Sequence, residues 1–284
     1  MGGDSSVLRP DHPLPRSLSA LAEEFGLEAI GDLDGVEVTG LTISSGGVQP
    51  GDLFIGMPGA RRHGAEFAEA ARDRGAVAIL TDRSGADLAA DTGLPILLVE
   101  SPREALGAVA AWVHRTAEHP ILLLGVTGTN GKTSVCYLLY GILGQLGLVS
   151  GLSTTAERRI GDVAVTSSLT TPEASELHGL LARMRESEVR AVALEVSAQA
   201  LTQHRIDGLV FDVVSFLNLG HDHLDDYEDM EQYFAAKLPL FDPDRARRGV
   251  VSLDSEWGAR LLDAAHIPVS TISKITRGER KNIT

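Results

Sequence analysis

The chain is poor in cysteine, in basic residues and in long apolar runs. Its 284 residues include one cysteine, Cys136, so no disulfide framework can form, which is typical of a reducing cytoplasm. Asp and Glu number 39 against 25 Lys and Arg, and the resulting net charge of −14 argues against a nucleic-acid partner. No apolar run approaches the roughly 20 residues of a membrane-spanning helix, and the N-terminus has no secretory apolar segment. These absences predict a cytoplasmic protein without membrane insertion.

The most informative stretch is residues 121–146, ILLLGVTGTNGKTSVCYLLYGILGQL. Its apolar start, Ile121–Leu124, predicts a strand buried on both faces, and apolar residues then recur at helical spacing from Val135 to Leu146. A glycine-rich turn ending in Gly131-Lys132-Thr133 lies between them. Backbone N–H groups and a helix N-terminus at such a turn face a phosphate, the lysine adds a point charge, and the threonine hydroxyl can bind Mg²⁺. The pattern therefore predicts a phosphate-binding P-loop.

This P-loop is a variant, because the strict pattern would place glycine where the chain has Val126. The alternative is a glycine-rich turn that binds nothing. The order of strand, Gly-Lys-Thr and amphipathic helix favours the phosphate site. Cys136, on the apolar side of the helix, is better explained as a small core residue than as a reactive thiol.

The order of expected elements predicts two α/β domains. Residues 1–16 hold three prolines and no periodicity, which is typical of a disordered tail. Residues 17–118 form a small N-terminal α/β domain, and residues 119–284 a P-loop domain with a mostly parallel sheet. In the first domain we expect helices at 18–25 (capped by Ser17), 65–74 and 102–115, and strands at 36–43, 53–57, 76–80 and 95–99.

In the second domain we expect a hairpin within 153–168, helices at 175–186, 229–240 and 255–265, and strands at 190–196, 211–217 and on both sides of the last helix. Thr171 would cap the helix at 175–186, with Pro172 in its first position. Pro239 lies late in its helix and should end or kink it.

Polar residues follow two of the expected parallel strands. Glu195 and Ser197 end the strand at 190–196, and residues 218–225, NLGHDHLD, follow the next strand. Ligands bind at the carboxyl ends of such strands, so Glu195 is a candidate for the Mg²⁺ of a nucleotide, and the His–Asp cluster is suited to a metal or phosphate. The alternatives are a solvated acid at Glu195, a helix N-cap at Asp222 or Asp225, and a solvated surface lysine at Lys237.

Several motifs together resemble the Mur ligase family, which joins amino acids to the peptidoglycan precursor using ATP. They are GVTGTNGKTS, SLTTPEASEL, EVSAQALTQHR, DHLDDYEDMEQYFAAK and, more weakly, VQPGDLF. The resemblance spans about residues 36–273 and is to the UDP-N-acetylmuramoyl-tripeptide synthetase (MurE-like) type, which adds the third residue. It implies a UDP-binding N-terminal domain, an ATPase middle domain, and a monomer that acts on small molecules.

The resemblance also implies roles for individual residues. The ATP phosphates would lie against Gly128, Thr129, Asn130, Gly131, Lys132, Thr133 and Ser134. The metal ligands would be Thr133, Glu195, His223 and Lys237, the last as a carbamate formed with CO₂. The catalytic residues would be Lys132, Glu195, His223 and Lys237, and the substrate-binding residues Ser45, Thr170, Thr171, Ser197, Gln203 and Arg205.

The reaction implied by the resemblance is ATP-driven acyl activation, with ATP and Mg²⁺ as cofactors. The carboxylate of UDP-MurNAc-L-Ala-D-Glu would attack the γ-phosphate, and the amino group of diaminopimelate or lysine would then displace phosphate from the acyl phosphate. The process would be cell-wall biogenesis, and with it cell shape and cell division.

The chain also departs from the family pattern. The first-domain motif DSR-x-V reads SSGGV at residues 44–48, Gln199 replaces a histidine, Ser252 and Ser255 replace an asparagine and an aspartate, and Pro239 interrupts the lysine helix. The chain ends before the family's third domain, which indicates either a fragment of a longer enzyme or a shortened relative. Two alternatives follow: a ligase for a folate-type or specialised substrate, and a non-catalytic nucleotide-binding protein.

Overall fold

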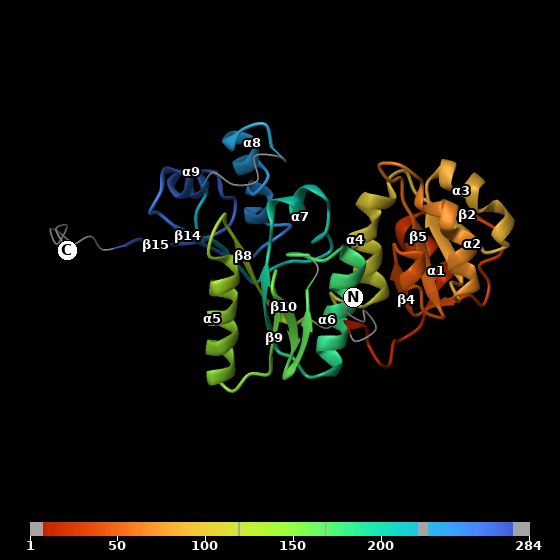
Figure 1. Ribbon diagram of the computed structural model, residues 1–284, viewed down its shortest axis with the longest axis horizontal. Coiled ribbons are helices and arrows are strands. Elements are labelled where there is room, and N and C mark those ends of the chain that lie inside the picture. The colour runs from red at the N-terminus through yellow and green to blue at the C-terminus, as the bar shows by residue number, and fades with distance from the viewer. Residues whose placement is uncertain (1–7, 119, 168, 221–226, 275–284) are drawn as a thin grey trace.

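The computed structural model describes residues 8–118, 120–167, 169–220 and 227–274, and two mostly parallel sheets organise them (Figure 1). The first sheet has the strand order β2-β7-β6-β5-β4 and the second the order β11-β10-β9-β12-β8-β13-β14-β15. The sheets divide the chain between β7 and β8, with α4 (Pro102–Val113) between them in sequence. The predicted α/β architecture is confirmed, whereas a boundary at 118/119 stays a prediction.

The first sheet is parallel except for its edge strand β2. Its strands are β2 (Glu28–Ile30), β4 (Gly40–Thr42), β5 (Asp52–Gly56), β6 (Ala78–Thr81) and β7 (Ile96–Leu98), and its helices are α1 (Leu18–Phe25), α2 (Ala68–Asp73), α3 (Arg83–Ala89) and α4. Ser17 caps α1, and Gly26 ends it in the left-handed conformation, as predicted. β2 and α3 were not predicted, because neither segment has a clear apolar period.

Two expectations for this domain need correction. The strand predicted at 36–43 is divided between β3 (Glu37–Val38), which pairs with β1 (Arg16–Ser17), and β4. The helix predicted at 65–74 begins as the 3₁₀ turn Gly64–Phe67 before α2.

Residues 8–16 contact both halves of the chain and do not form the predicted disordered tail: Leu8 joins the large core cluster of the second sheet, and Asp11 N donates to Glu186 Oε2 at 2.8 Å. Leu8 is buried, Arg9 Nη1 lies 2.8 Å from Asp52 Oδ2, and the Arg16 guanidinium lies 3.8 Å from the centre of the Trp112 ring. Residues 1–7 lie outside the described part of the chain. The signals that sequence reasoning missed here were the two arginines, whose partners are distant in sequence.

The second sheet has β8 (Leu122–Thr127) at its centre, parallel to β12 (Ala191–Glu195) on one side and to β13 (Val213–Phe216) on the other. The remaining parallel strands are β9 (Ser150–Ser153), β14 (Gly249–Ser252) and β15 (Val269–Ile272). The predicted hairpin is confirmed as β10 (Glu157–Ile160) and β11 (Val163–Thr166). The helices are α5 (Lys132–Gln145), α6 (Ala174–Glu186), α7 (Ala198–Thr202), α8 (Met230–Ala235) and α9 (Glu256–Ala264).

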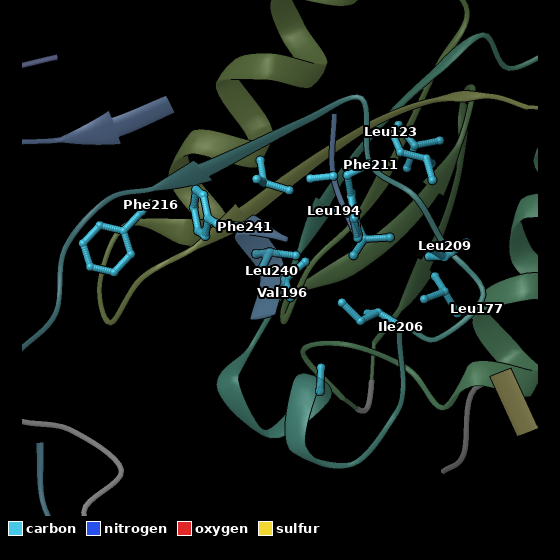
Figure 2. Close-up of a cluster of buried hydrophobic side chains, with 14 of the residues drawn as sticks. Leu123, Leu177, Leu194, Val196, Ile206, Leu209, Phe211, Phe216, Leu240 and Phe241 are labelled. Carbon is cyan, nitrogen blue, oxygen red and sulfur yellow. The ribbon is translucent and has the colours of Figure 1, made fainter. Parts of the chain in front are cut away.

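The two faces of this sheet carry different cores. Neighbouring residues of a strand point to opposite faces: Val192 and Leu194 join the large cluster that includes α6, and Ala193 joins a small cluster with Cys136 of α5. Figure 2 shows the large cluster, in which Leu194 gathers with side chains that include Phe211 and Phe241. Burial of Cys136 raises the pKa of its thiol, which agrees with a core role.

The P-loop helix α5 is confirmed, but much of its apolar surface faces solvent. Leu138 is 66% exposed and Leu146 71%, whereas Leu143 is buried. After Lys132 the helix has no charged residue, so apolar periodicity alone does not tell its buried side from its exposed side. α8 ends at Ala235, and Pro239 lies in the 3₁₀ turn Leu238–Phe241, as its position predicted. Among the described residues, no helix has the length and apolarity needed to cross a membrane.

We expect the two sides of α5 to differ sharply in their contribution to stability. Leu143→Ala should lower the free energy of unfolding by about 2–5 kcal/mol, because it leaves a cavity in the core. Leu146→Ala, the matched exposed change, should alter it by less than about 0.5 kcal/mol. Urea unfolding followed by circular dichroism measures both, and equal losses would contradict the packing of α5 described here.

Candidate active site

The P-loop backbone requires glycine at two positions. Gly128 has φ of +152° and Gly131 φ of +85°, in the region that side chains rarely adopt. A Cβ on Gly128 would also come within 3.1 Å of Leu217 Cβ. Gly131 precedes the first residue of α5, so the N–H groups of that helix end open onto the loop. The backbone therefore has the glycine-dependent turn and helix start that the sequence predicted, and phosphate binding there stays a prediction.

Lys132 folds back over its own loop. Its Nζ donates to Gly128 O at 3.0 Å and to Thr129 O at 2.9 Å. The ammonium group thus lies above the turn where phosphate oxygens would bind. Thr133 and Ser134 follow in the first turn of α5, as the sequence predicted.

The loop is fastened to the segment that follows β13, through residues that sequence reasoning did not assign. Asn218 Oδ1 accepts from Asn130 N at 3.0 Å, and Asn218 Nδ2 donates to Asn130 O at 3.0 Å. Thr129 N donates to Asn218 O at 3.1 Å, and Gly220 N donates to Thr129 Oγ1 at 2.9 Å. Asn218 and Gly220 begin the polar segment after a parallel strand, and this position was the available signal.

Lys237 is buried, which excludes the surface-lysine alternative. Its side chain is 0% exposed, and Nζ has no hydrogen-bond partner among the described residues. Nζ lies 4.4 Å from the centre of the Tyr233 ring, which is within range of a cation–π contact. Burial, and secondarily the charge of Lys132, lower the pKa of Lys237 to about 7. An amine with a pKa of about 7 is about half in its neutral, nucleophilic form at neutral pH.

One cavity collects residues from four separated segments. Its lining residues are Gly128, Lys132, Thr170, Ser197, Ala198, Gln199, Tyr227, Tyr233 and Lys237. The structure therefore brings two predicted catalytic lysines together with two predicted substrate-binding residues, Thr170 and Ser197. Gln199, which stands where the family has histidine, lines the same cavity. Ser45 lies in the 3₁₀ turn Ser45–Gly47 of the first domain and is not among these lining residues.

Glu195, at the end of β12, is buried and is not the solvated acid considered as an alternative. Its carboxylate accepts from Thr155 N at 3.2 Å and from Thr155 Oγ1 at 3.0 Å. The same Thr155 hydroxyl lies 3.0 Å from Thr170 Oγ1. Thr155 thus links Glu195 to Thr170 of the cavity, and no motif in the sequence identifies Thr155 as a site residue.

Thr171 does not cap α6, contrary to the sequence-based expectation, because Glu173 occupies the N-cap position. Its hydroxyl instead donates to Glu195 O at 2.8 Å and accepts from Ser197 N at 3.2 Å. Thr171 therefore holds the α6 entry against the end of β12. The Glu195 carbonyl and the Ser197 N–H, at the end of β12, bind this hydroxyl in place of the N–H groups at the start of α6.

The remaining predicted site residues stand as follows. Arg205 Nη2 donates to Gln203 Oε1 at 2.6 Å, and Arg205 Nε donates to Glu173 Oε1 at 3.0 Å. His223, together with the possible caps Asp222 and Asp225, lies outside the described residues. Within the described ranges no group of three or more His, Cys, Asp and Glu side chains is arranged to hold a metal ion.

The fold and the site define a class: a two-domain α/β protein with a P-loop beside a buried lysine of lowered pKa. The sequence matches the Mur ligase middle domain over residues 126–283, and the domain described as "Mur ligase family, catalytic domain" over residues 37–114. The chain belongs to the Mur ligase family.

Two bacterial relatives show which members the chain is similar to. It is 64% identical over 278 residues to the UDP-N-acetylmuramyl-tripeptide synthetase of Leifsonia xyli subsp. xyli, covering 98% of this chain and 54% of that protein. It is 48% identical over 265 residues to the UDP-N-acetylmuramoyl-L-alanyl-D-glutamate–2,6-diaminopimelate ligase of Streptomyces avermitilis, covering 93% and 52%. The chain thus spans about half the length of the curated relatives it matches.

Solved structures support the fold. A UDP-N-acetylmuramoyl-L-alanyl-D-glutamate–2,6-diaminopimelate ligase superposes with a TM-score of 0.75 at 22% identity, over 91% of this chain and 53% of that one. MurF from Acinetobacter baumannii gives a TM-score of 0.68 at 18% identity, over 91% and 53%. MurF from Thermotoga maritima, solved with ADP, gives 0.60 at 21% identity, over 82% and 50%. At these identities the likeness concerns the fold.

The buried lysine should make stability depend on pH. Between the folded pKa of about 7 and the unfolded value of 10.5, the unfolded chain binds more protons, so the free energy of unfolding rises with pH across this window. Below about pH 7 the lysine is protonated in both states, and the full cost of burying a cation remains.

Lys237→Met removes this titration, so its stability advantage over the wild type should be largest near pH 6. The advantage should shrink by roughly a few kcal/mol toward pH 10. Urea unfolding of Mg²⁺-free, CO₂-free protein at a series of pH values measures it. A difference between the two proteins that did not change with pH would contradict the burial of a titrating amine.

Loss of the Asn218 side chain should loosen the P-loop and weaken nucleotide binding. Asn218→Ala removes two hydrogen bonds to Asn130, worth roughly 1 kcal/mol each, and should raise the Kd for ATP about 5- to 30-fold. Isothermal titration calorimetry gives the Kd. Gln145→Ala, at the opposite end of α5, is the control that should leave it unchanged. Equal affinities in the wild type and Asn218→Ala would show that these bonds do not shape the loop.

Proposed function

We propose that the chain forms the substrate-binding and ATP-binding domains of an amide-bond-forming ligase that adds the third amino acid to UDP-MurNAc-L-Ala-D-Glu. The observation that carries this proposal is Lys237, a buried amine in one cavity with Lys132 of the P-loop. The names of the two relatives support the same reaction. Diaminopimelate and lysine both remain candidates for the added amino acid, and cytoplasmic cell-wall synthesis by a monomer is the proposed setting.

The proposed chemistry of Lys237 follows from its burial. Its neutral amine would attack CO₂, forming a carbamate and releasing one proton to water, so that a cation becomes an anionic oxygen donor. This change suits a position where Nζ has no hydrogen-bond partner among the described residues. Thr133, Glu195, His223 and carbamylated Lys237 would hold Mg²⁺, which when bound supplies positive charge next to the phosphoryl oxygens.

The protein would then act by positioning and charge. The N–H groups of the P-loop, from Gly128 to Ser134, would hold the ATP phosphates, and Lys132 would turn from its loop carbonyls toward the γ-phosphate. The substrate carboxylate would attack that phosphate to give an acyl phosphate. The amino group of the incoming amino acid would displace phosphate through a tetrahedral intermediate. Thr170, Thr171, Ser197, Gln203 and Arg205 would orient the substrate peptide, and Ser45 its uridine end.

The direct test is product mass spectrometry. We expect the chain, incubated with ATP, Mg²⁺, UDP-MurNAc-L-Ala-D-Glu and a mixture of diamino acids, to give a UDP-MurNAc-tripeptide whose mass names the added amino acid. Lys132→Ala should lower turnover at least about 100-fold, because it removes charge stabilisation of the transferred phosphoryl group. Lys237→Ala should abolish turnover, and added bicarbonate should not restore it, because no amine remains to form the carbamate.

Binding provides the outcome that would contradict the proposal. Titration of UDP-MurNAc-L-Ala-D-Glu should be saturable, with UDP-glucose as the control for its nucleotide part. The peptidoglycan assignment is contradicted if the chain is folded and binds ATP but shows no saturable binding of the peptide substrate. Normal turnover by Lys237→Ala would refute the carbamate.

A further inference from the structure

Three charged residues link the first domain to the proposed substrate site. Arg103 lies in the first turn of α4, Glu173 is the N-cap of α6, and Arg205 follows α7. Arg103 Nη1 lies 2.5 Å from Glu173 Oε2, and Arg205 Nε lies 3.0 Å from Glu173 Oε1. Each carboxylate oxygen of Glu173 therefore has its own arginine. Figure 1 shows α4 beside α6, where these two helices join the domains.

The segment that contains Glu173 also contacts the end of β12, where Glu195 lies. Two residues before Glu173, the Thr171 hydroxyl bonds to Glu195 O and to Ser197 N. One residue after it, Ala174 is buried in the core cluster of the first domain. Residues 171–174 are thus attached to the first domain on one side and to the end of β12 on the other. A displacement of this segment would move both attachments.

The contacts of Arg205 hold its guanidinium in place but do not use all of its N–H donors. Besides the bond to Glu173, Nη2 donates to Gln203 Oε1 at 2.6 Å, and Nη1 lies 3.5 Å from Thr171 O. A guanidinium has five N–H donors, so one N–H on each Nη remains for a ligand. The Arg205 and Glu173 side chains are 12% and 13% exposed, so their pairing is only partly screened by water.

The charge of the three residues favours an acidic ligand. Two arginines and one glutamate leave a net charge of +1. Without Arg103, the pair of Glu173 and Arg205 would be neutral, and an incoming carboxylate would meet no net attraction. Arg103, from the other domain, therefore offsets the negative charge that Glu173 brings to the site.

We propose that Glu173 is a positioning residue that fixes Arg205 for the acidic peptide of the substrate, and that Arg103 compensates its charge from the first domain. The identity of the ligand rests on the proposed function, whereas the placement of Arg205 by Glu173 is independent of it. Glu173 acts through Arg205, and the first domain becomes part of substrate recognition at the peptide end as well as at the uridine end.

Glu173→Gln separates positioning from simple electrostatics, because the two predict opposite signs. If Glu173 positions Arg205, the Kd for UDP-MurNAc-L-Ala-D-Glu rises about tenfold, since a charge-assisted hydrogen bond is lost. If Glu173 only contributes charge, its removal tightens binding of the acidic substrate. Arg103→Gln should also weaken binding, and the Kd for ATP should change less than about twofold in both variants. Tighter binding by Glu173→Gln overturns the proposal.

Matched controls come from an exposed ion pair in the first domain. Glu28 Oε2 and Arg83 Nη2 lie 2.8 Å apart, with side chains 61% and 68% exposed. Glu28→Gln and Arg83→Gln make the same charge changes away from the cavity and should leave the Kd for the peptide substrate unchanged. A similar loss of affinity in Glu28→Gln and Glu173→Gln would show that the effect does not require the contact with Arg205, and would overturn the positioning role.

A measurement that needs no substrate tests the geometry alone. In ¹⁵N-labelled protein, the Arg205 Nε–H resonance, assigned by its loss in Arg205→Lys, should shift and exchange faster with water in Glu173→Gln. It should be unchanged in Glu28→Gln. An unshifted resonance in Glu173→Gln overturns the proposal whatever the substrate. If the wild type binds no UDP-MurNAc-dipeptide while the resonance responds as expected, the proposed function fails and the positioning of Arg205 stands.

Discussion

The parallel alignment of β8 with β12 and β13 is the constraint on which the site depends. In register, Glu195 lies opposite Val126, and Phe216 opposite Thr127, so three strands end at one edge of the sheet. The P-loop leaves this edge from β8, Glu195 ends β12, and Asn218 follows β13. Residues nearly a hundred positions apart therefore come within hydrogen-bonding distance, as Asn130 and Asn218 do. A shift of one residue in either pairing would separate the loop from its anchor and reverse the faces of every side chain.

The elements with strong local signals were predictable from the sequence. The P-loop, the Ser17 cap, the hairpin and the break at Pro239 each depend on a few adjacent residues. The contacts that complete the site are not local. Thr155 meets Glu195 only because β9 and β12 pair, and Thr171 leaves its expected capping role because two backbone groups at the end of β12 lie nearer. Arg9 and Arg16 order the N-terminal segment through partners that no short window contains.

Some sequence patterns were uninformative for a physical reason. Apolar residues lie on all sides of α5, so its helical period identifies a helix without identifying its buried side. Of the α5 residues only Cys136 and Leu143 are buried, and Cys136 is the one that joins the small cluster beneath the helix. For Lys237 the sequence pattern was misleading in the opposite way, because a polar residue that is expected at the surface is buried. A lysine near the end of an amphipathic helix ordinarily reaches solvent, but this one is followed directly by the turn Leu238–Phe241 and is buried with its Nζ 4.4 Å from the centre of the Tyr233 ring. The family resemblance predicted a catalytic role for Lys237, whereas its burial could not be predicted from the local sequence.

The two lysines of the cavity oppose each other as long as both are amines. The charge of Lys132 contributes to the lowered pKa of Lys237, so each proton on one disfavours a proton on the other. Phosphates bound at the P-loop would offset Lys132 and favour a charged Lys237, which burial opposes. A carbamate removes this conflict, because it replaces a buried cation by an anion that attracts Lys132 and an added metal ion alike. On this argument the charge of Lys132 would favour the proposed carbamate, whereas burial by itself favours the neutral amine that would react with CO₂.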